Sequence, residues 1–410
     1  MCPALTPALE RTNTVSKKKP NSIKQLGSVL LISMAAGAGA RYLANKNRVQ
    51  ESRAYDYDTP QQLIDWQVAR TVALRVSQWQ QFPVRDRAGR QALYEGQVAQ
   101  SQPLIDEYLN VKLPESLSRV QVVDRREWIE ANLRSFEHLF NPIEELYRDA
   151  ARKTGRNPAV NSLNRGFVGA QVGAMVGVLA RKVLGQYDLS LLSPKGDPGV
   201  LYFVEPNISL IQTSLGVDDH DFRLWITLHE TTHAYEFEAY PWVREHFSNL
   251  VSRYFSELGG QLDTLRNGVW SFLQRIFKGK QDGDSHWIES VLTPTQRQVF
   301  NELQSLMSLV EGYSNHIMNA VGRDILPNFE QIEARMHQRK QNRSLFDELF
   351  NRITGMTLKM QQYEQGEKFV NAIADHGGKE LAARVWEGPH MLPTLEEIRN
   401  PQLWIKRVGA

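Results

Sequence analysis

The sequence predicts a mainly α-helical protein of the α+β type, with a small β-sheet beside one central helix. Two observations predict this class. Apolar residues recur at helical spacing along most of the chain beyond residue 55, and only two short runs, 120–124 and 201–204, have the composition of β-strands. A content of 41% hydrophobic and 23% charged residues is typical of a globular chain. We therefore expect one helical domain over residues 55–410, preceded by a tail over residues 1–54.

The N-terminal tail differs from the rest of the chain in composition. Residues 1–50 contain eight Lys and Arg residues and one acid, Glu10, which indicates a basic, disordered segment. The 15 residues from Leu26 to Ala40 are uncharged and mostly apolar or small, which is shorter than the roughly 20 residues that span a bilayer. Residues 26–44 are therefore interpreted as a signal sequence, a membrane anchor or a hydrophobic helix docked on the body. A cytoplasmic and a membrane-anchored location both remain open.

Charge and cysteine content narrow the classes of partner and metal site. The chain beyond residue 50 has 40 basic and 45 acidic residues, so we expect no nucleic-acid-binding face on it. The single cysteine, Cys2, excludes disulfides within the chain and a thiolate cluster for structural zinc. A metal ion bound by the body must therefore be held by histidines and carboxylates. Nothing in the sequence indicates the oligomeric state.

The first half of the body is predicted to be helical with one strand. A helix opens at Thr59-Pro60, an amphipathic helix covers 89–110, and a strand at 120–124 leads into a helix that ends at Asn141-Pro142. In the stretch 166–184, glycines spaced mostly by four lie among apolar residues, a pattern that lets two helices approach closely. Because Gln171 interrupts this stretch and charged residues end it, we predict a buried core helix, packed against the helix that follows at 222–240, rather than a membrane span.

The stretch around residue 230 is the one that carries chemistry. A short strand, Leu201–Val204, precedes a helical pattern that starts at Asp218, Asp219 and Asp221 and continues to Pro241. This helix contains His229-Glu230-Thr231-Thr232-His233. Residues four apart on a helix lie only about 40° apart around its axis, so both imidazoles can bind one ion, as in zinc peptidases. Glu230 lies beside that ion, where a carboxylate can take a proton from water.

A catalytic zinc site needs a third protein ligand. Glu311 is the preferred candidate, because it lies within the apolar helical run 306–313, where an unpaired charge is unfavourable. We expect the adjacent Gly312 to let the motif helix approach closely. His316 is the alternative ligand, although from an unbroken helix it points about 140° away from Glu311 and is equally well interpreted as a core histidine or a substrate-binding group.

Further residues are candidates for supporting roles. Glu236 shares the ligand face of the motif helix and is expected to orient an imidazole. Tyr313, His316 and Tyr240 are candidates for contacting substrate or stabilising an oxyanion, without support from spacing.

Several separated segments resemble a bacterial zincin-like metallopeptidase family of unknown substrate. The resemblance rests on FRLWITLHETTHAYEFEAYPWVREH at 222–246, VLGQYDL at 183–189 and SLVEGYSNHIMNAVG at 308–322. Shorter matches occur at 122–125, 203–207, 359–370, 392–394 and 401–404. The resemblance implies a single gluzincin-like domain with Zn²⁺ on His229 and His233, Glu230 as the base and Glu311 as the third ligand. Members of this family are often described as associated with deazaflavin coenzyme biosynthesis, and the resemblance implies the same association for this chain.

Two hypotheses about function follow. The first is a zinc metallopeptidase that uses Glu230 to assist the attack of water on a peptide carbonyl of a peptide or protein substrate. The alternative is a non-proteolytic, metal-stabilised binding or accessory protein, associated with a membrane through residues 26–44 or linked to coenzyme metabolism. An intact Glu230 favours the first hypothesis, because a structural metal site has no use for a base.

Overall fold

A computed structural model describes residues 64–113, 119–154, 158–187, 199–259, 293–341 and 356–409. The predicted basic tail, the hydrophobic segment 26–44, the domain boundary near residue 55 and the helix start at Thr59-Pro60 lie outside these residues. Within the described part of the chain, no helix is both long enough and apolar enough to cross a bilayer.

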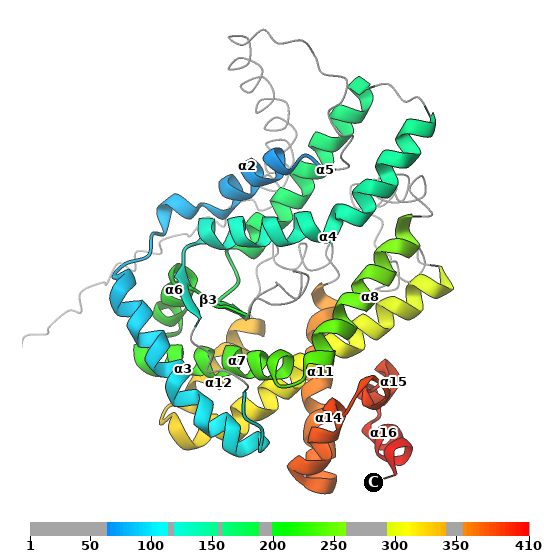
Figure 1. Ribbon diagram of the computed structural model, residues 1–410. Helices are drawn as coiled ribbons and strands as arrows, with labels where there is room; N and C mark the ends of the chain where they lie inside the picture. Colours follow the sequence, from blue (N-terminus) through cyan, green and yellow to red (C-terminus); the bar gives the residue numbers. More distant parts are fainter. Residues whose placement is uncertain are drawn as a thin grey trace, which may run out of the picture.

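Helices make up most of the described chain, together with one three-stranded sheet (Figure 1). The main helices are α2 (Trp66–Ser77), α3 (Arg87–Leu109), α4 (Arg125–Thr154), α5 (Pro158–Leu179), α6 (Glu205–Leu215), α7 (Asp219–Glu238), α8 (Pro241–Gly259), α11 (Pro294–Ile325), α12 (Phe329–Gln341), α14 (Met356–Ala383), α15 (Leu395–Arg399) and α16 (Pro401–Val408). The strands are β1 (Val120–Val123), β2 (Gly185–Tyr187) and β3 (Leu201–Val204). The prediction of a mainly α protein with a small sheet is confirmed.

The sheet has the order β1-β3-β2, with β1 and β3 parallel and β2 antiparallel to β3. Strands β1 and β3 match the two predicted strands, whereas β2 was not predicted. Its three residues have no alternating apolar pattern, and pairing with β3 makes them a strand. The outer edge of β1 is closed by α3, because Gln91 and Arg87 donate hydrogen bonds to the carbonyls of Val120 and Val122.

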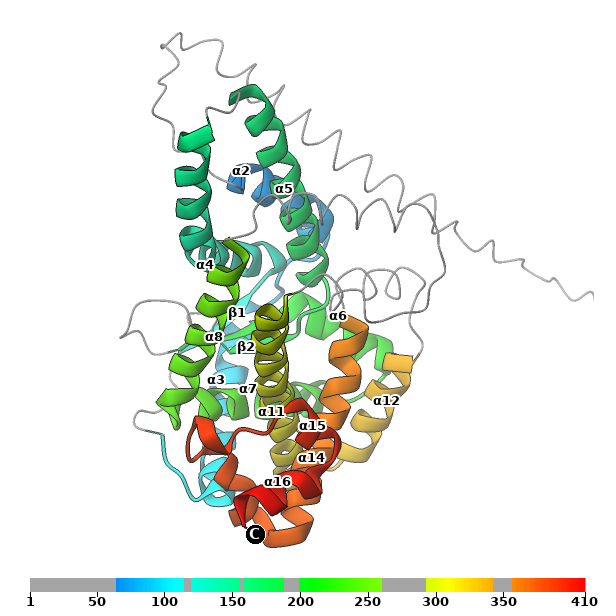
Figure 2. The same ribbon diagram turned by 90° about the vertical axis from the view of Figure 1, so that its right-hand side faces the viewer.

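The main core surrounds α7, which packs against α3, α8, α11 and β2 (Figure 2). Thirteen of the 20 residues of α7 are buried, as expected of a helix enclosed by other elements. The C-terminal segment packs against the same core through two fully enclosed indoles, Trp386 and Trp404. Glycine allows α11 and α14 to meet backbone to backbone, because a Cβ on Gly366 would collide with the Ser308 carbonyl.

A second core lies between α2, α4 and α5, the helices at the top of Figure 1. The glycine row of α5 is a close-packing surface, as predicted, because a Cβ on each of three glycines would collide with a backbone carbonyl of the facing segment: Gly169 with Asp65, Gly173 with Ala69 and Gly177 with Ala73. The predicted partner was wrong. These glycines pack on α2 rather than on the motif helix, and β2, which follows α5, lies against α7 instead.

The structure also differs from the prediction at two element boundaries. Helix α4 does not end at Asn141-Pro142 but continues to Thr154. Proline removes only one backbone donor, and the packing of α4 on α2 and α8 outweighs that loss. The chain does not pass directly from β3 into the motif helix, because α6 lies between them and begins with Glu205-Pro206, where proline is favourable in the first helical turn.

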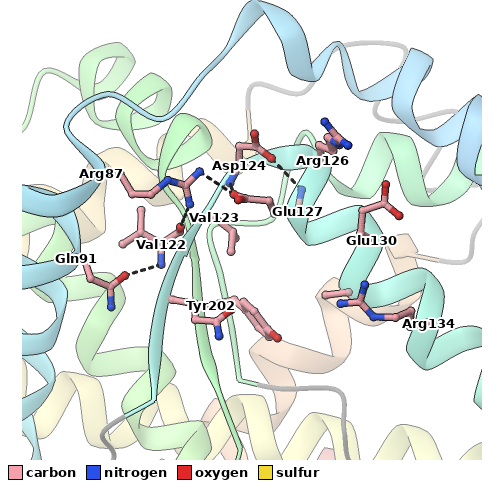
Figure 3. Close-up of a pocket in the computed structure, with 12 residues that line it drawn as sticks. Arg87, Gln91, Val122, Val123, Asp124, Arg126, Glu127, Glu130, Arg134 and Tyr202 are labelled. Atoms are coloured by element: carbon pink, nitrogen blue, oxygen red, sulfur yellow. Dashed lines mark hydrogen bonds and ion pairs between the residues drawn. The ribbon is translucent and has the colours of Figure 1, made fainter.

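A surface cavity of about 620 Å³ lies outside β1, between α3 and α4 (Figure 3). Its charged side chains are of both signs and partly bond one another: Arg87 donates to Glu127 at 2.9 Å, and Asp124 accepts from the Glu127 amide. No excess charge of one sign therefore favours a class of ligand there.

Candidate metal centre

Helix α7 is held at its start by charged side chains. Asp218 is the N-cap and accepts a hydrogen bond from the Asp221 amide at 2.9 Å. One turn further on, the fully buried Arg223 forms ion pairs with Glu205 of α6 and with Asp219. Glu205 in turn accepts a hydrogen bond from the Tyr94 hydroxyl at 2.7 Å. These contacts fix the position of α7 relative to α3 and α6.

Helix α11 begins with a capping box at Thr293 and Gln296 and crosses the core beside α7. Glu311 lies near its middle, with 27% of its side chain exposed. The expectation for the neighbouring Gly312 was wrong. A Cβ there would collide with the backbone of Gly366, so this glycine accommodates α14 rather than the motif helix.

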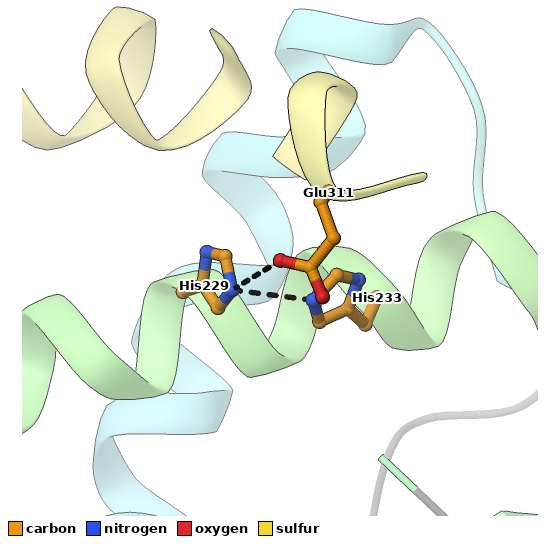
Figure 4. Close-up of side chains that lie close together, drawn as sticks. All are labelled: His229, His233 and Glu311. Carbon is orange, nitrogen blue, oxygen red and sulfur yellow. Dashed lines mark hydrogen bonds and ion pairs between the residues drawn. The ribbon is translucent and has the colours of Figure 1, made fainter. Parts of the chain in front are cut away.

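The structure brings His229, His233 and Glu311 together (Figure 4). One ligand atom from each lies within 4.8 Å of the others, and among the described residues no other group of His, Cys, Asp and Glu meets this condition. The two Nε2 atoms of the histidines are 3.2 Å apart, and Glu311 Oε2 lies 3.9 Å from His229 Nε2. The carboxylate of α11 thus points at the imidazole pair of α7.

This donor set fits zinc. Two ligand atoms of a tetrahedral ion at 2.0–2.1 Å are separated by about 3.3 Å, close to the 3.2 Å between the two imidazole nitrogens. Two imidazoles and one carboxylate form the three-ligand set of several catalytic zinc sites, in which one position stays open. The three side chains are 12–27% exposed, so this group is in contact with water rather than sealed in the core.

Glu236 and Ser314 contact His233 on the side away from His229. Nδ1 of His233 lies 2.8 Å from Oε2 of Glu236 and 2.9 Å from the Ser314 hydroxyl, which donates to Glu236 Oε1 at 3.1 Å. Burial lowers the pKa of His233, but the hydrogen bond and charge of Glu236 outweigh it and raise that pKa above its ordinary value. Ser314 was missed, although it follows Glu311 by three residues and so lies on the same side of α11.

Glu230 is buried next to the ligands and is 8% exposed. Burial raises the pKa of its carboxyl to about 7, a shift that the charge of His233 opposes and that of Glu311 reinforces. A carboxyl group with a pKa near neutrality can accept a proton and return it at neutral pH, with a small free-energy cost in either step. The Glu230 carboxylate also contacts β2, at Gly185 and at the Tyr187 amide.

The remaining candidates lie outside the group of three. His316 bonds Tyr108 through Nε2 at 2.7 Å and Asn371 through Nδ1 at 2.6 Å, so both of its ring nitrogens are used. The rings of Tyr313 and Tyr240 both pack on Trp386. The roles suggested for these three residues in substrate binding stay predictions.

A motif helix carrying two histidines and a buried glutamate, completed by a glutamate from a second helix, defines a zinc hydrolase of the zincin type. The comparison with protein families agrees: the zincin-like metallopeptidase family matches residues 64–405. The chain therefore belongs to the zincin-like metallopeptidase family, and its cofactor is Zn²⁺, as expected from the sequence.

A solved structure supports this assignment. The chain resembles a protein from Chloroflexus aurantiacus whose crystal structure is described as that of a presumed hydrolase with a novel fold. The two chains are 49% identical, with a TM-score of 0.65, and the match covers 85% of this chain and 99% of the other. No curated protein matches this chain.

Proposed function

We propose that this protein is a zinc metallopeptidase that hydrolyses a peptide bond in a peptide or protein substrate. The observation that carries the proposal is the position of Glu230. It is a buried carboxylate of raised pKa, adjacent in sequence to one metal ligand and close enough to His233 and Glu311 for their charges to shift its pKa. A purely structural metal site gains nothing from an acid that is held this way, whereas hydrolysis requires a base beside the ion.

The roles of the residues follow from their positions. His229, His233 and Glu311 would hold Zn²⁺, which when bound polarises a carbonyl and lowers the pKa of water towards about 7. Glu230 accepts a proton from the attacking water and later returns it to the leaving amine. Glu236 and Ser314 keep the His233 ring oriented with Nε2 towards the ion.

The test is metal content by elemental mass spectrometry combined with digestion of a broad peptide library. We expect about one zinc per wild-type chain, zinc retained but cleavage abolished in Glu230→Gln, and zinc lost in Glu311→Ala. Glu245→Gln, an exposed acid on α8, is the matched control and should behave as wild type. Stoichiometric zinc without cleavage of any peptide would favour the metal-stabilised binding protein, and full zinc in Glu311→Ala would overturn the ligand assignment.

A further inference from the structure

Strand β2 lies along α7 on the side that carries Glu230. At Gly185 the approach leaves no room for a side chain: a Cβ there would lie 2.5 Å from Cγ, 2.6 Å from Cδ and 2.7 Å from Oε1 of Glu230. Gly185 is not at a positive φ, so the backbone itself does not require glycine at this position. The close approach of the Glu230 carboxylate is what requires it.

Tyr187 ties the same strand to α7 at two points. Its amide donates a hydrogen bond to the Glu230 carboxylate. Its ring stacks on Phe237, with 6.1 Å between centroids, and its hydroxyl donates to Glu238. Glu238 also accepts a hydrogen bond from Arg244 of α8 at 2.7 Å, so the carboxylate that Tyr187 contacts is itself held in place. Residues 230 and 237 are seven apart and therefore share one side of the helix.

We infer that β2 is a positioning strand for the catalytic base, in which Gly185 leaves the space and Tyr187 supplies the donor that hold the Glu230 carboxylate in place. The role of Glu230 as the catalytic base rests on the proposed function, whereas the contacts between β2 and Glu230 are independent of it. A free glutamate side chain samples several rotamers, and a carboxylate that is contacted on one side and hydrogen-bonded on another keeps one of them. The two residues act through Glu230 and are positioning residues rather than catalytic ones.

The contact also explains why substitution at Gly185 should be informative. The atoms that a new Cβ would meet belong to the end of a flexible side chain rather than to backbone. Alanine can therefore be accommodated by displacing the Glu230 carboxylate while the fold is kept. A displacement of about 1 Å in a reacting group can lower turnover on the order of 100-fold.

The first experiment needs no substrate. Amide hydrogen exchange at Tyr187, resolved to single residues by mass spectrometry, is compared in the full-length wild type, Glu230→Gln and Glu230→Ala. Glu230→Ala removes the acceptor, so exchange of this amide should accelerate about tenfold or more, whereas Glu230→Gln keeps an acceptor oxygen and should retain most of the protection. Amides of α11 serve as the internal control for global stability. Equal protection of the Tyr187 amide in all three proteins would overturn the inference.

The second experiment compares Gly185→Ala with Gly96→Ala, because a Cβ at the exposed Gly96 of α3 meets nothing within 4 Å. Both variants should keep wild-type zinc content and thermal midpoint. We expect kcat to fall about 100-fold with unchanged KM in Gly185→Ala only. Full kcat in Gly185→Ala would overturn the inference. If the wild type cleaves nothing, the proposed function fails, but the exchange experiment still decides whether β2 holds Glu230.

Discussion

Nδ1 of His233 lies 2.8 Å from Oε2 of Glu236, and this contact directs the opposite ring nitrogen, Nε2, towards His229. Both residues belong to α7, three positions apart, and Ser314 of α11 bonds the same imidazole and the same carboxylate. A carboxylate behind a metal-binding histidine fixes the ring orientation and raises the basicity of the ligand nitrogen. The motif helix therefore carries a ligand and the group that orients it.

Replacing this carboxylate should weaken metal binding. Glu236→Gln keeps the size of the side chain but removes the negative charge behind His233, so we expect zinc affinity to fall about 10- to 100-fold. The dissociation constant is measured by competition with a chromophoric chelator at neutral pH. Glu245→Gln should leave the affinity unchanged, and equal affinity in Glu236→Gln and wild type would contradict the orienting role.

Zinc should also stabilise the fold, because its ligands come from two helices that lie far apart in the sequence. An ion that binds only the folded state adds about 4 kcal/mol at a free concentration 1,000 times its Kd. We expect chelation to lower the thermal midpoint of the wild type, and zinc to have no such effect on Glu311→Gln. The measurement is a thermal melt with and without zinc. A zinc-dependent shift of the same size in Glu311→Gln would show that Glu311 is not a ligand.

The buried ion pair behind α7 gives a prediction about stability that is separate from the metal. Arg223 is fully buried and pairs with Glu205, itself 2% exposed. Arg223→Met would leave the buried Glu205 carboxylate with a weaker ion pair, to Arg90 at 3.4 Å, so the free energy of unfolding should fall by about 3 kcal/mol, the lower end of the cost of breaking a buried ion pair. The double variant Arg223→Met/Glu205→Gln should recover part of this loss. Urea denaturation measures both, and a double variant less stable than Arg223→Met would contradict this explanation.

The pH dependence of stability should include a contribution from Glu397 in α15. Burial tends to raise the pKa of this carboxyl, but hydrogen bonds from Arg407 and Thr394 outweigh burial and lower the pKa below its ordinary value. Because the folded-state pKa is the lower one, the stabilisation is present above the ordinary glutamate pKa and is lost as pH falls through the lowered value.

This contribution can be isolated with Glu397→Gln. Arg407 is 39% exposed, so solvent screening limits the expected difference from wild type to about 1 kcal/mol at neutral pH, with wild type the more stable. The difference should shrink as the pH of urea denaturation is lowered through the acidic range. A difference that stays constant with pH would show that the charge of Glu397 does not contribute.

Much of the fold class and of the metal centre could be predicted because the signals are local. Helical periodicity predicts α3, α7 and α11, and the strands β1 and β3 are short apolar runs with clear ends. The assignment of Glu311 came from a charge inside an apolar helical run, which signals a partner without identifying it. The structure places the His229 and His233 pair beside it.

What was missed depends on contacts between elements. Strand β2 has no pattern of its own and is a strand because β3 pairs with it. Gly312 and the glycines of α5 were recognised as sites of close approach, but the helices that approach them, α14 and α2, were not. A glycine shows that space is needed and carries no information about which element uses it.

The sequence by itself therefore determined the helical class, the shared helix face of His229 and His233, and the set of residues able to hold zinc. These properties follow from the 3.6-residue period of the helix and the chemistry of side chains, which act within about one turn. Only the tertiary structure decided that α11 brings Glu311 to that face, that Ser314 supports His233, and that β2 lies against Glu230. His229 and Glu311 are 82 positions apart in the sequence and His233 and Ser314 are 81 apart, and only the packing of the whole core sets such contacts.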